Sequence, residues 1–470
     1  MDLHLDADSV DGRRAGLERA LRDAIRGGRL APGARLPATR RLAEELGVSR
    51  GTVKAAYDQL IAEGFLTARQ GAGTEVASLP SLDTPPPKSA ARVRAPVHDL
   101  RPGAPDVGAF PADAWVKAVR RAVAVAPVSA YDYGDPLGRI ELRTALSEYL
   151  GRARGIVAPP ERILVTSGAV QGLALLTRVL EGGAVAMEDP GLPFHREVVR
   201  HAGGRVVPVR VDDLGVDVDD LRDPAAVVVT PAHQYPTGVT LHPSRRRALT
   251  DWARARGAWI VEDDYDGEFR YDRQPVGALQ GMAPGQVVCL GTVSKTLGPG
   301  LRLGWMVLPP DLVGPVADAK LHSDHSTETI GQLALAELIR SHAYDRHVRA
   351  GRLRYRRRRD LLVSRLGARW GVRGIAAGLH ALVEVEDETA VLERAAAEGL
   401  AVGSLGEHWH SRGPREGLVV GPREGLVVGP REGLVVGPRE GLVVGYGTPR
   451  EGAYPRALEA LARVLELGHS

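Results

Sequence analysis

The strongest constraint on the fold of this 470-residue chain is a series of short, continuous apolar runs in its larger, C-terminal part. They occupy residues 163–166, 184–187, 227–229, 259–261 and 287–290. Strands that are apolar on both faces suit a parallel sheet covered by helices. Segments with helical character between them, such as 170–180 and 244–256, supply the crossovers. The pattern predicts a doubly wound α/β domain.

The chain divides into three regions. Residues 1–78 are rich in arginine and have helical periodicity, residues 79–96 contain a proline cluster, and residues 97–470 carry the α/β pattern. We therefore predict an N-terminal domain, a semi-rigid linker and a large C-terminal domain. The octapeptide Pro-Arg-Glu-Gly-Leu-Val-Val-Gly occurs four times in tandem over residues 414–445. We expect one copy to form a strand and the others to be a neutral surface insertion.

The charge distribution draws attention to the N-terminus. The whole chain has a net charge of only +3, whereas residues 13–76 hold 12 basic and 7 acidic side chains, an excess of +5. A local excess of this kind suits a phosphate backbone. The single cysteine, Cys289, points to a reducing compartment. The first residues lack the apolar segment of a signal peptide, and no apolar run approaches the roughly 20 residues of a membrane span. We expect a soluble, cytoplasmic protein.

Residues 13–76 have the order helix, helix, turn, helix and β-hairpin. We expect Thr39 to cap the second helix, which Gly47 ends, and Ser49 to cap a third helix that runs to about Glu63. Residues 65–67 and 74–76 flank a Gly-containing turn and read as a wing. This order is typical of proteins whose third helix enters the major groove of DNA. A three-helix protein-interaction module is the alternative.

Three segments of this region match a known DNA-binding family. Residues 36–40, 47–53 and 60–64, together with the Gly-rich wing, resemble the GntR-type winged helix. Hydroxyl and cationic side chains suit phosphate and base contacts, and a glycine lets the wing approach the duplex closely. The resemblance implies double-stranded operator DNA as a partner and contacts from Arg40, Ser49, Arg50, Thr52, Lys54 and Gly71.

Chemical groups for an aldehyde cofactor gather in two segments of the C-terminal part. In residues 291–297, a lysine follows a buried strand, where its amine can form a Schiff base, and nearby hydroxyls and Arg302 can hold a phosphate. Residues 262–265, Glu-Asp-Asp-Tyr, follow another strand. A carboxylate there can pair with a pyridinium nitrogen, and a phenol can bond a phenolate oxygen. Taken singly, each segment also fits ordinary surface residues.

Two further elements complete a pattern. Residues 167–169 open a helix after a strand, which makes an anion site, and residues 133–138 form a Tyr-containing turn. In order and spacing the four elements resemble a fold-type I aminotransferase over nearly all of residues 98–470. The resemblance implies pyridoxal 5′-phosphate on Lys295, with Asp263 at the pyridine nitrogen and Tyr265 at the phenolate oxygen. It implies phosphate contacts from Gly168, Ala169, Thr292, Ser294 and Arg302, and from Tyr133 of the neighbouring subunit of a homodimer.

The fusion of the two parts resembles the MocR (GabR/PdxR-like) regulators, whose characteristic segment matches residues 230–238. The fold that this resemblance implies is α/β. A winged helix-turn-helix precedes a PLP-dependent transferase domain of fold type I, which has a large domain with a mainly parallel sheet and a small α+β C-terminal subdomain.

Three departures from true aminotransferases bear on activity. Tyr235 stands where the enzymes have a cofactor-binding asparagine, and Leu192 stands at the ring-stacking position, with Phe194 two residues on. Residues 442–446 align with the segment that carries the carboxylate-binding arginine but contain none; Arg439 and Arg450 are the alternatives. A missing clamp costs roughly several kcal/mol of substrate orientation. We therefore predict cofactor binding without efficient transamination.

The sequence thus predicts a PLP-dependent, DNA-binding transcription regulator. Its effector is PLP itself or an amine or amino acid that forms an external aldimine with it. An active aminotransferase with an autoregulatory DNA-binding domain is the alternative. A third possibility is a DNA-binding scaffold that binds no cofactor, but the presence of Lys295, Asp263 and Arg302 argues against it. The basic run 352–359 favours a solvated or salt-bridged helix face, with an extension of the DNA-facing surface as the alternative. His322, His325, His342 and His347 lack metal-ligand spacing with acids or cysteines, so we expect no metal.

Overall fold

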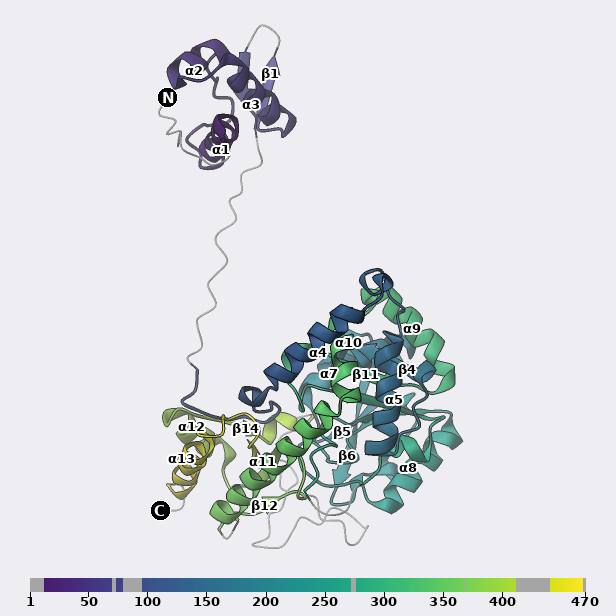
Figure 1. The fold of residues 1–470 in the computed structure, drawn as a ribbon. Helices are drawn as coiled ribbons and strands as arrows, with labels where there is room; N and C mark the ends of the chain where they lie inside the picture. The colour runs from purple at the N-terminus through teal and green to yellow at the C-terminus, as the bar shows by residue number, and fades with distance from the viewer. Residues whose placement is uncertain are drawn as a thin grey trace. The chain divides into compact units, whose positions relative to one another are not determined.

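The structure is a computed structural model and describes residues 12–69, 73–78, 95–271, 276–367, 369–410 and 440–467. The chain forms two compact units, Met1–Val93 and Arg94–Ser470 (Figure 1). No helix in these described ranges is long and apolar enough to cross a bilayer.

The N-terminal unit is a three-helix bundle with a hairpin. Its elements are α1 (Gly12–Arg26), α2 (Thr39–Leu46), α3 (Arg50–Ala62), β1 (Leu66–Arg69) and β2 (Gly73–Val76). The Ser49 Oγ accepts the N–H of Thr52 at 3.0 Å and caps α3 as predicted, and Gly47 ends α2 in a left-handed conformation. The expected cap of α2 is wrong by one residue. Extended Ala38 occupies the N-cap position without a side-chain bond, so Thr39 is the first helical residue.

The C-terminal unit is built on an eight-stranded sheet of order β4-β11-β10-β9-β8-β5-β6-β7. Six strands are parallel, and β11 and β7 run against them. The strands are β4 (Ile163–Thr166), β5 (Ala184–Asp189), β6 (Arg205–Asp212), β7 (Gly215–Val216), β8 (Ala226–Val229), β9 (Trp259–Asp263), β10 (Val287–Thr292) and β11 (Gly304–Val307). All five predicted apolar runs lie in these strands, and the mainly parallel sheet is confirmed.

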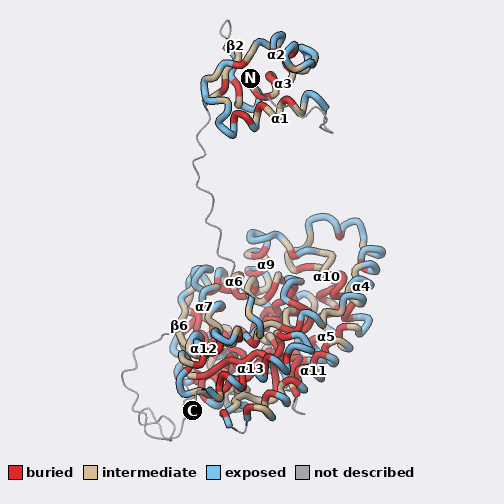
Figure 2. Tube along the Cα trace, turned by 90° about the vertical axis from the view of Figure 1, so that its left-hand side faces the viewer, coloured by how far each residue is buried: buried red, intermediate tan, exposed pale blue. Residues whose placement is uncertain are grey.

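Helices cover both faces of this sheet, as strands buried on both faces require. One face packs against α6 (Ala169–Val179), α7 (Pro193–His201) and α9 (Pro310–Asp324). The other packs against α5 (Ile140–Arg154), α8 (Pro243–Arg256) and α10 (Thr329–Arg340), with α4 (Ala112–Val125) outside α10. Figure 2 shows the buried residues running through the interior of this unit.

A second, five-stranded sheet forms the small subdomain, in the order β12-β13-β15-β14-β3. Its strands are β3 (His98–Leu100), β12 (Val372–Arg373), β13 (His380–Glu384), β14 (Leu400–Ser404) and β15 (Gly441–Gly445). It packs with α11 (Ala343–Leu366), α12 (Glu388–Ala397) and α13 (Tyr454–Glu466). Strand β15 is fully buried and belongs to the fourth octapeptide copy. The first three copies lie outside the described residues.

Candidate functional site

A cavity of about 260 Å³ lies where the parallel strands of the large sheet end. The carboxyl edge of such a sheet is the usual place for a ligand site. Of the nine residues expected to bind the cofactor, eight line this cavity: Gly168, Ala169, Asp263, Tyr265, Thr292, Ser294, Lys295 and Arg302. The fold therefore brings together segments that are far apart in the sequence.

The three consecutive acids at the end of β9 have three different environments. Glu262 accepts the backbone N–H groups of Leu279 and Gln280 at 2.7 and 2.8 Å, on the side away from the cavity. Asp264 is held by Arg154 through two bonds of 2.7 Å. Only Asp263 of these three lines the cavity. Strand β9 runs two residues further than predicted, to Asp263. Because successive side chains of a strand point to opposite faces, Asp263 points away from its neighbours Glu262 and Asp264.

Asp263 is suited to a cationic ring nitrogen. Its Oδ1 is buried and has no hydrogen-bond partner among the described residues, and its Oδ2 lies 3.6 Å from the His195 Nδ1. Burial raises the pKa of Asp263 to about 7, against the opposing effect of the Lys295 ammonium. A carboxylate in this state gains from a nearby cation. The unsatisfied oxygen therefore fits a protonated pyridine, the group that PLP would present.

Lys295 follows β10 and reaches across the cavity, where its Nζ donates a hydrogen bond to the Gly103 carbonyl. Burial lowers the pKa of this lysine, and the nearby Asp263 opposes that effect. A lowered pKa increases the fraction of neutral amine, which is the form that attacks an aldehyde. Burial also lowers the pKa of His195 to about 4, with a further contribution from Lys295. His195 therefore lines the cavity as a neutral imidazole.

The N-terminus of α6 forms an open cradle beside Arg302. Gly168 is the N-cap with φ 125°, and a Cβ built there would lie 3.5 Å from both Nη atoms of Arg302. The Gln171 Oε1 accepts the Ser167 N–H at 2.8 Å and steadies this turn. The Thr292 and Ser294 hydroxyl oxygens lie 2.8 Å apart on the adjacent loop. Free backbone N–H groups, two hydroxyls and a guanidinium match the needs of a phosphate.

Four further lining residues come from the turn after β8 and from the small subdomain: Thr230, Tyr235, Leu379 and His380. Tyr235 stands where the enzymes have their cofactor-binding asparagine, whereas no motif singled out Leu379 or His380 for this place. The Tyr235 hydroxyl lies 3.1 Å from the His408 Nε2. Leu192 and His195 line the wall, whereas Phe194 is 61 % exposed and lies elsewhere, so it does not replace the missing stacking residue. Only the three-dimensional fold brings β13 to this cavity.

The structure offers no replacement for the missing carboxylate clamp among the residues that it describes. Strand β15 contains no arginine, and the Arg450 side chain packs beside Gly108 rather than in the cavity. Arg439 lies outside the described residues. Arg302 is the only arginine in the described lining.

Tyr133 is the ninth expected cofactor residue and does not line the cavity of its own chain. It is 84 % exposed, and its ring lies 4.8 Å from that of His325. Its role at the phosphate of a neighbouring subunit therefore stays a prediction.

The predicted DNA-contacting residues lie around α2 and α3. Arg40, Arg50 and Lys54 are exposed, with weak i,i+4 ion pairs from Arg40 to Glu44 and from Lys54 to Asp58. The Ser49 and Thr52 hydroxyl oxygens lie 2.9 Å apart at the start of α3. Gly71 lies outside the described residues.

The basic run of α11 is divided between internal and exposed side chains. Arg352 donates to the Glu268 carbonyl, and buried Arg358 is paired with Asp106 at 2.7 Å. Arg356 and Arg357 are 59 % and 72 % exposed and lie near Asp360 and Glu451. The run thus has a structural part and a salt-bridged, solvated part.

Comparisons with known proteins agree with this division. Residues 14–76 match the family of bacterial regulatory proteins of the gntR type, and residues 96–404 match aminotransferase class I and II. The chain is 34 % identical to the HTH-type pyridoxine biosynthesis transcriptional regulator PdxR of Corynebacterium glutamicum, over 86 % of this chain and 90 % of that protein. It is also 34 % identical to the probable rhizopine catabolism regulatory protein MocR of Rhizobium meliloti, over 89 % and 92 % of the two chains.

Solved structures agree on the fold of the larger unit. An aspartate aminotransferase double mutant from Thermus thermophilus matches with a TM-score of 0.65 and 26 % identity, over 79 % of this chain and 92 % of that one. A kynurenine aminotransferase from Pyrococcus horikoshii gives a TM-score of 0.68 at 24 % identity, over 80 % and 92 %. The chain therefore belongs to the MocR/PdxR-type family of HTH regulators, and it is a DNA-binding transcription regulator that depends on pyridoxal phosphate.

Proposed function

We propose that this regulator binds PLP on Lys295 and uses the occupied cavity to sense its effector, without efficient turnover. The observation that carries the proposal is the contrast within the cavity. The cofactor side offers Lys295, Asp263 and Arg302, whereas no second arginine lines the described cavity to orient a substrate carboxylate.

The same contrast also limits the chemical class of the effector. The remaining polar groups of the lining include the buried Glu188, whose pKa burial raises to about 7, and His380. An ionised carboxylate only accepts hydrogen bonds, so Glu188 suits an amine and disfavours a carboxylate. We therefore favour PLP itself or an amine without a carboxylate as the effector. The effector must bind the two conformations of the regulator differently in order to change DNA binding.

The test is the visible absorption spectrum of the purified protein with PLP, beside Lys295→Ala. We expect an absorption band that requires Lys295. Addition of a sensed amine should shift this band to a new, stable position without continued turnover. Sustained conversion of amino and keto acids would instead establish the alternative, an aminotransferase with an autoregulatory DNA-binding domain. Absence of the band from the wild-type protein would contradict cofactor binding on Lys295.

We further propose that the protein is a homodimer with shared sites. Large apolar side chains are exposed along α4 and the turn that follows it: Val116, Val123, Val125, Val128, Tyr131 and Tyr133. An apolar strip of this kind marks an interface. A second copy that covers this strip would place its Tyr133 at the phosphate of the first. Mixing Lys295→Ala with Tyr133→Phe subunits tests this arrangement, because one site of each mixed dimer would regain both groups and hence the PLP affinity of the wild type, which neither parent variant has.

In the N-terminal unit, we propose that Arg40, Ser49, Arg50, Thr52, Lys54 and Gly71 contact the operator. The exposure of the cationic members supports this assignment. A regulator of this kind acts where the DNA is, which we take to be the cytoplasm.

A further inference from the structure

A buried chain of polar groups leads away from the cavity behind Tyr265. The Tyr265 hydroxyl donates to the His233 carbonyl at 3.1 Å and lies 3.2 Å from the His233 Nδ1. The same Nδ1 lies 2.8 Å from the Asp266 Oδ2. Asp266 and His233 are only 2 % and 3 % exposed. The chain thus runs from a carboxylate through an imidazole to a phenol that lines the cavity.

The carboxylate fixes the proton of the imidazole. A carboxylate accepts hydrogen bonds and donates none, so the proton of His233 lies on Nδ1. That N–H faces both the Asp266 oxygen and the phenol oxygen. The His233 Nε2 has no hydrogen-bond partner among the described residues. The Tyr265 oxygen therefore accepts the His233 N–H, and its single proton, which meets the His233 carbonyl in this structure, is the one that it would turn toward the cofactor.

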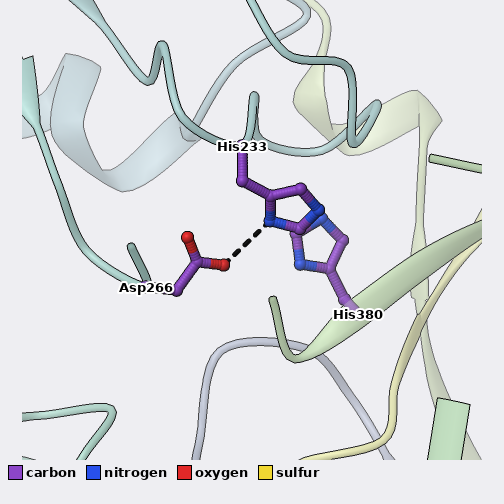
Figure 3. Close-up of side chains that lie close together, drawn as sticks. All are labelled: His233, Asp266 and His380. Carbon is purple, nitrogen blue, oxygen red and sulfur yellow. Dashed lines mark hydrogen bonds and ion pairs between the residues drawn. The ribbon is translucent and has the colours of Figure 1, made fainter. Parts of the chain in front are cut away.

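The surroundings of His233 leave its ring little freedom. A Cβ on Gly378, which has φ 72°, would lie 2.2 Å from the His233 Cε1 and 2.6 Å from the Asp266 Oδ2. The His380 ring packs against the other side, with centroids 4.8 Å apart, and the polar atoms of the three side chains lie within 4.8 Å of one another (Figure 3). Burial, and then His233, lowers the pKa of His380 well below its usual value, so His380 lies beside His233 as a neutral imidazole.

We propose that Asp266 and His233 are positioning residues that hold the Tyr265 phenol toward the cofactor and strengthen it as a hydrogen-bond donor. The inference rests on the proposed role of Tyr265 at the cofactor's phenolate oxygen. A hydroxyl that accepts a hydrogen bond is a better donor, because linked hydrogen bonds polarise one another. A stronger donor favours the anionic form of the oxygen that it meets. The pair therefore sets the pH at which the bound cofactor changes its protonation state.

The test is a pH titration of the visible band of the full-length holoprotein. Tyr265→Phe removes the donor, and we expect the midpoint to rise by about one unit or more. His233→Gln keeps the phenol but removes the fixed N–H, and we expect a rise of about 0.3–0.7 unit. His201→Gln, on the exposed end of α7, is the control that should leave the midpoint unchanged.

The double variant decides whether His233 acts through Tyr265. If it does, His233→Gln adds no further shift in the Tyr265→Phe background. Additive shifts, or an unchanged midpoint in folded His233→Gln, would overturn the inference. If His233→Gln does not fold, Asp266→Asn serves instead, because it keeps the side-chain shape and removes the fixed carboxylate. Failure of the proposed function looks different, since the wild-type protein would then show no Lys295-dependent band.

Discussion

The two units of the chain place their charges in opposite ways. In the part of the chain that the structure describes, every buried charged side chain lies in the C-terminal unit. The N-terminal unit keeps Arg40, Arg50 and Lys54 exposed around an apolar core. Buried charges shift in pKa, whereas exposed charges are screened by salt. The cofactor domain should therefore respond chiefly to pH, and the winged helix chiefly to ionic strength.

The largest effect on the cofactor domain is expected from a substitution of the buried Asp263. We expect Asp263→Asn to weaken PLP binding by about 10- to 100-fold, because a charge-assisted bond to the pyridine nitrogen is lost. A titration of the visible band measures the affinity. An unchanged affinity would show that the buried carboxylate does not meet the ring.

The same substitution should stabilise the protein without cofactor. The pKa of Asp263 is raised from 3.8 to about 7 in the folded state, so the ionised carboxylate disfavours folding. The free energy of unfolding of the wild type therefore falls as the pH rises from about 4 to 7. The thermal midpoint of Asp263→Asn should exceed that of the wild type, by a margin that grows from pH 4 to pH 7 and then levels off. A margin that shrinks with rising pH would contradict the assigned shift.

Gly168 tests whether the C-terminal unit holds its anion by backbone geometry. An alanine there would adopt φ 125°, a left-handed conformation that costs about 1–3 kcal/mol, and would displace the α6 N-terminus that faces Arg302. We expect Gly168→Ala to weaken PLP binding by roughly tenfold. Pyridoxal without the phosphate serves as the matched ligand, and its affinity should change much less. Equal losses for both ligands would place the phosphate elsewhere.

Ser49 tests the corresponding backbone device in the N-terminal unit. Ser49→Ala removes the acceptor for the Thr52 N–H and should lower the stability of α3 by about 1 kcal/mol. Hydrogen exchange of the α3 amides reports this loss as faster local opening. Ser49→Asp retains an N-cap and should exchange like the wild type. If the α3 amides of Ser49→Ala are as protected as those of the wild type, the Ser49 cap does not stabilise this helix.

The smallest effect is expected at Lys54. Its ion pair with Asp58 is exposed and weak, so the ammonium can exchange it for a phosphate at little cost. Lys54→Ala should reduce the slope of log affinity against log salt by about one on a random-sequence duplex. Arg19, on α1, provides a comparison that should leave the slope unchanged. Equal salt slopes for the Lys54 and Arg19 variants would contradict a contact between α3 and the DNA.

The sequence predicted the parts of this architecture that local patterns encode. Continuous apolar runs identified the strands, and the resemblance to fold-type I aminotransferases implied eight residues that the fold gathers around one cavity. It did not predict that His380 lines the cavity, because nothing local shows that β13 reaches it. Nor did it separate Asp263 from Asp264 on physical grounds. That distinction depends on Arg154, which is distant in the sequence and meets Asp264 only in the folded chain.

Strand β15 has a consequence for how this chain can change its length. The strand comes from the last of four identical units, so every unit carries the same Gly-Leu-Val-Val-Gly at its end. Deleting or duplicating one unit leaves the sequence on both sides of the junction intact, including the segment that pairs with β13 and β14. The small subdomain thus contains an interchangeable part. A change of length by whole octapeptides therefore leaves the composition of the sheet's core unaltered.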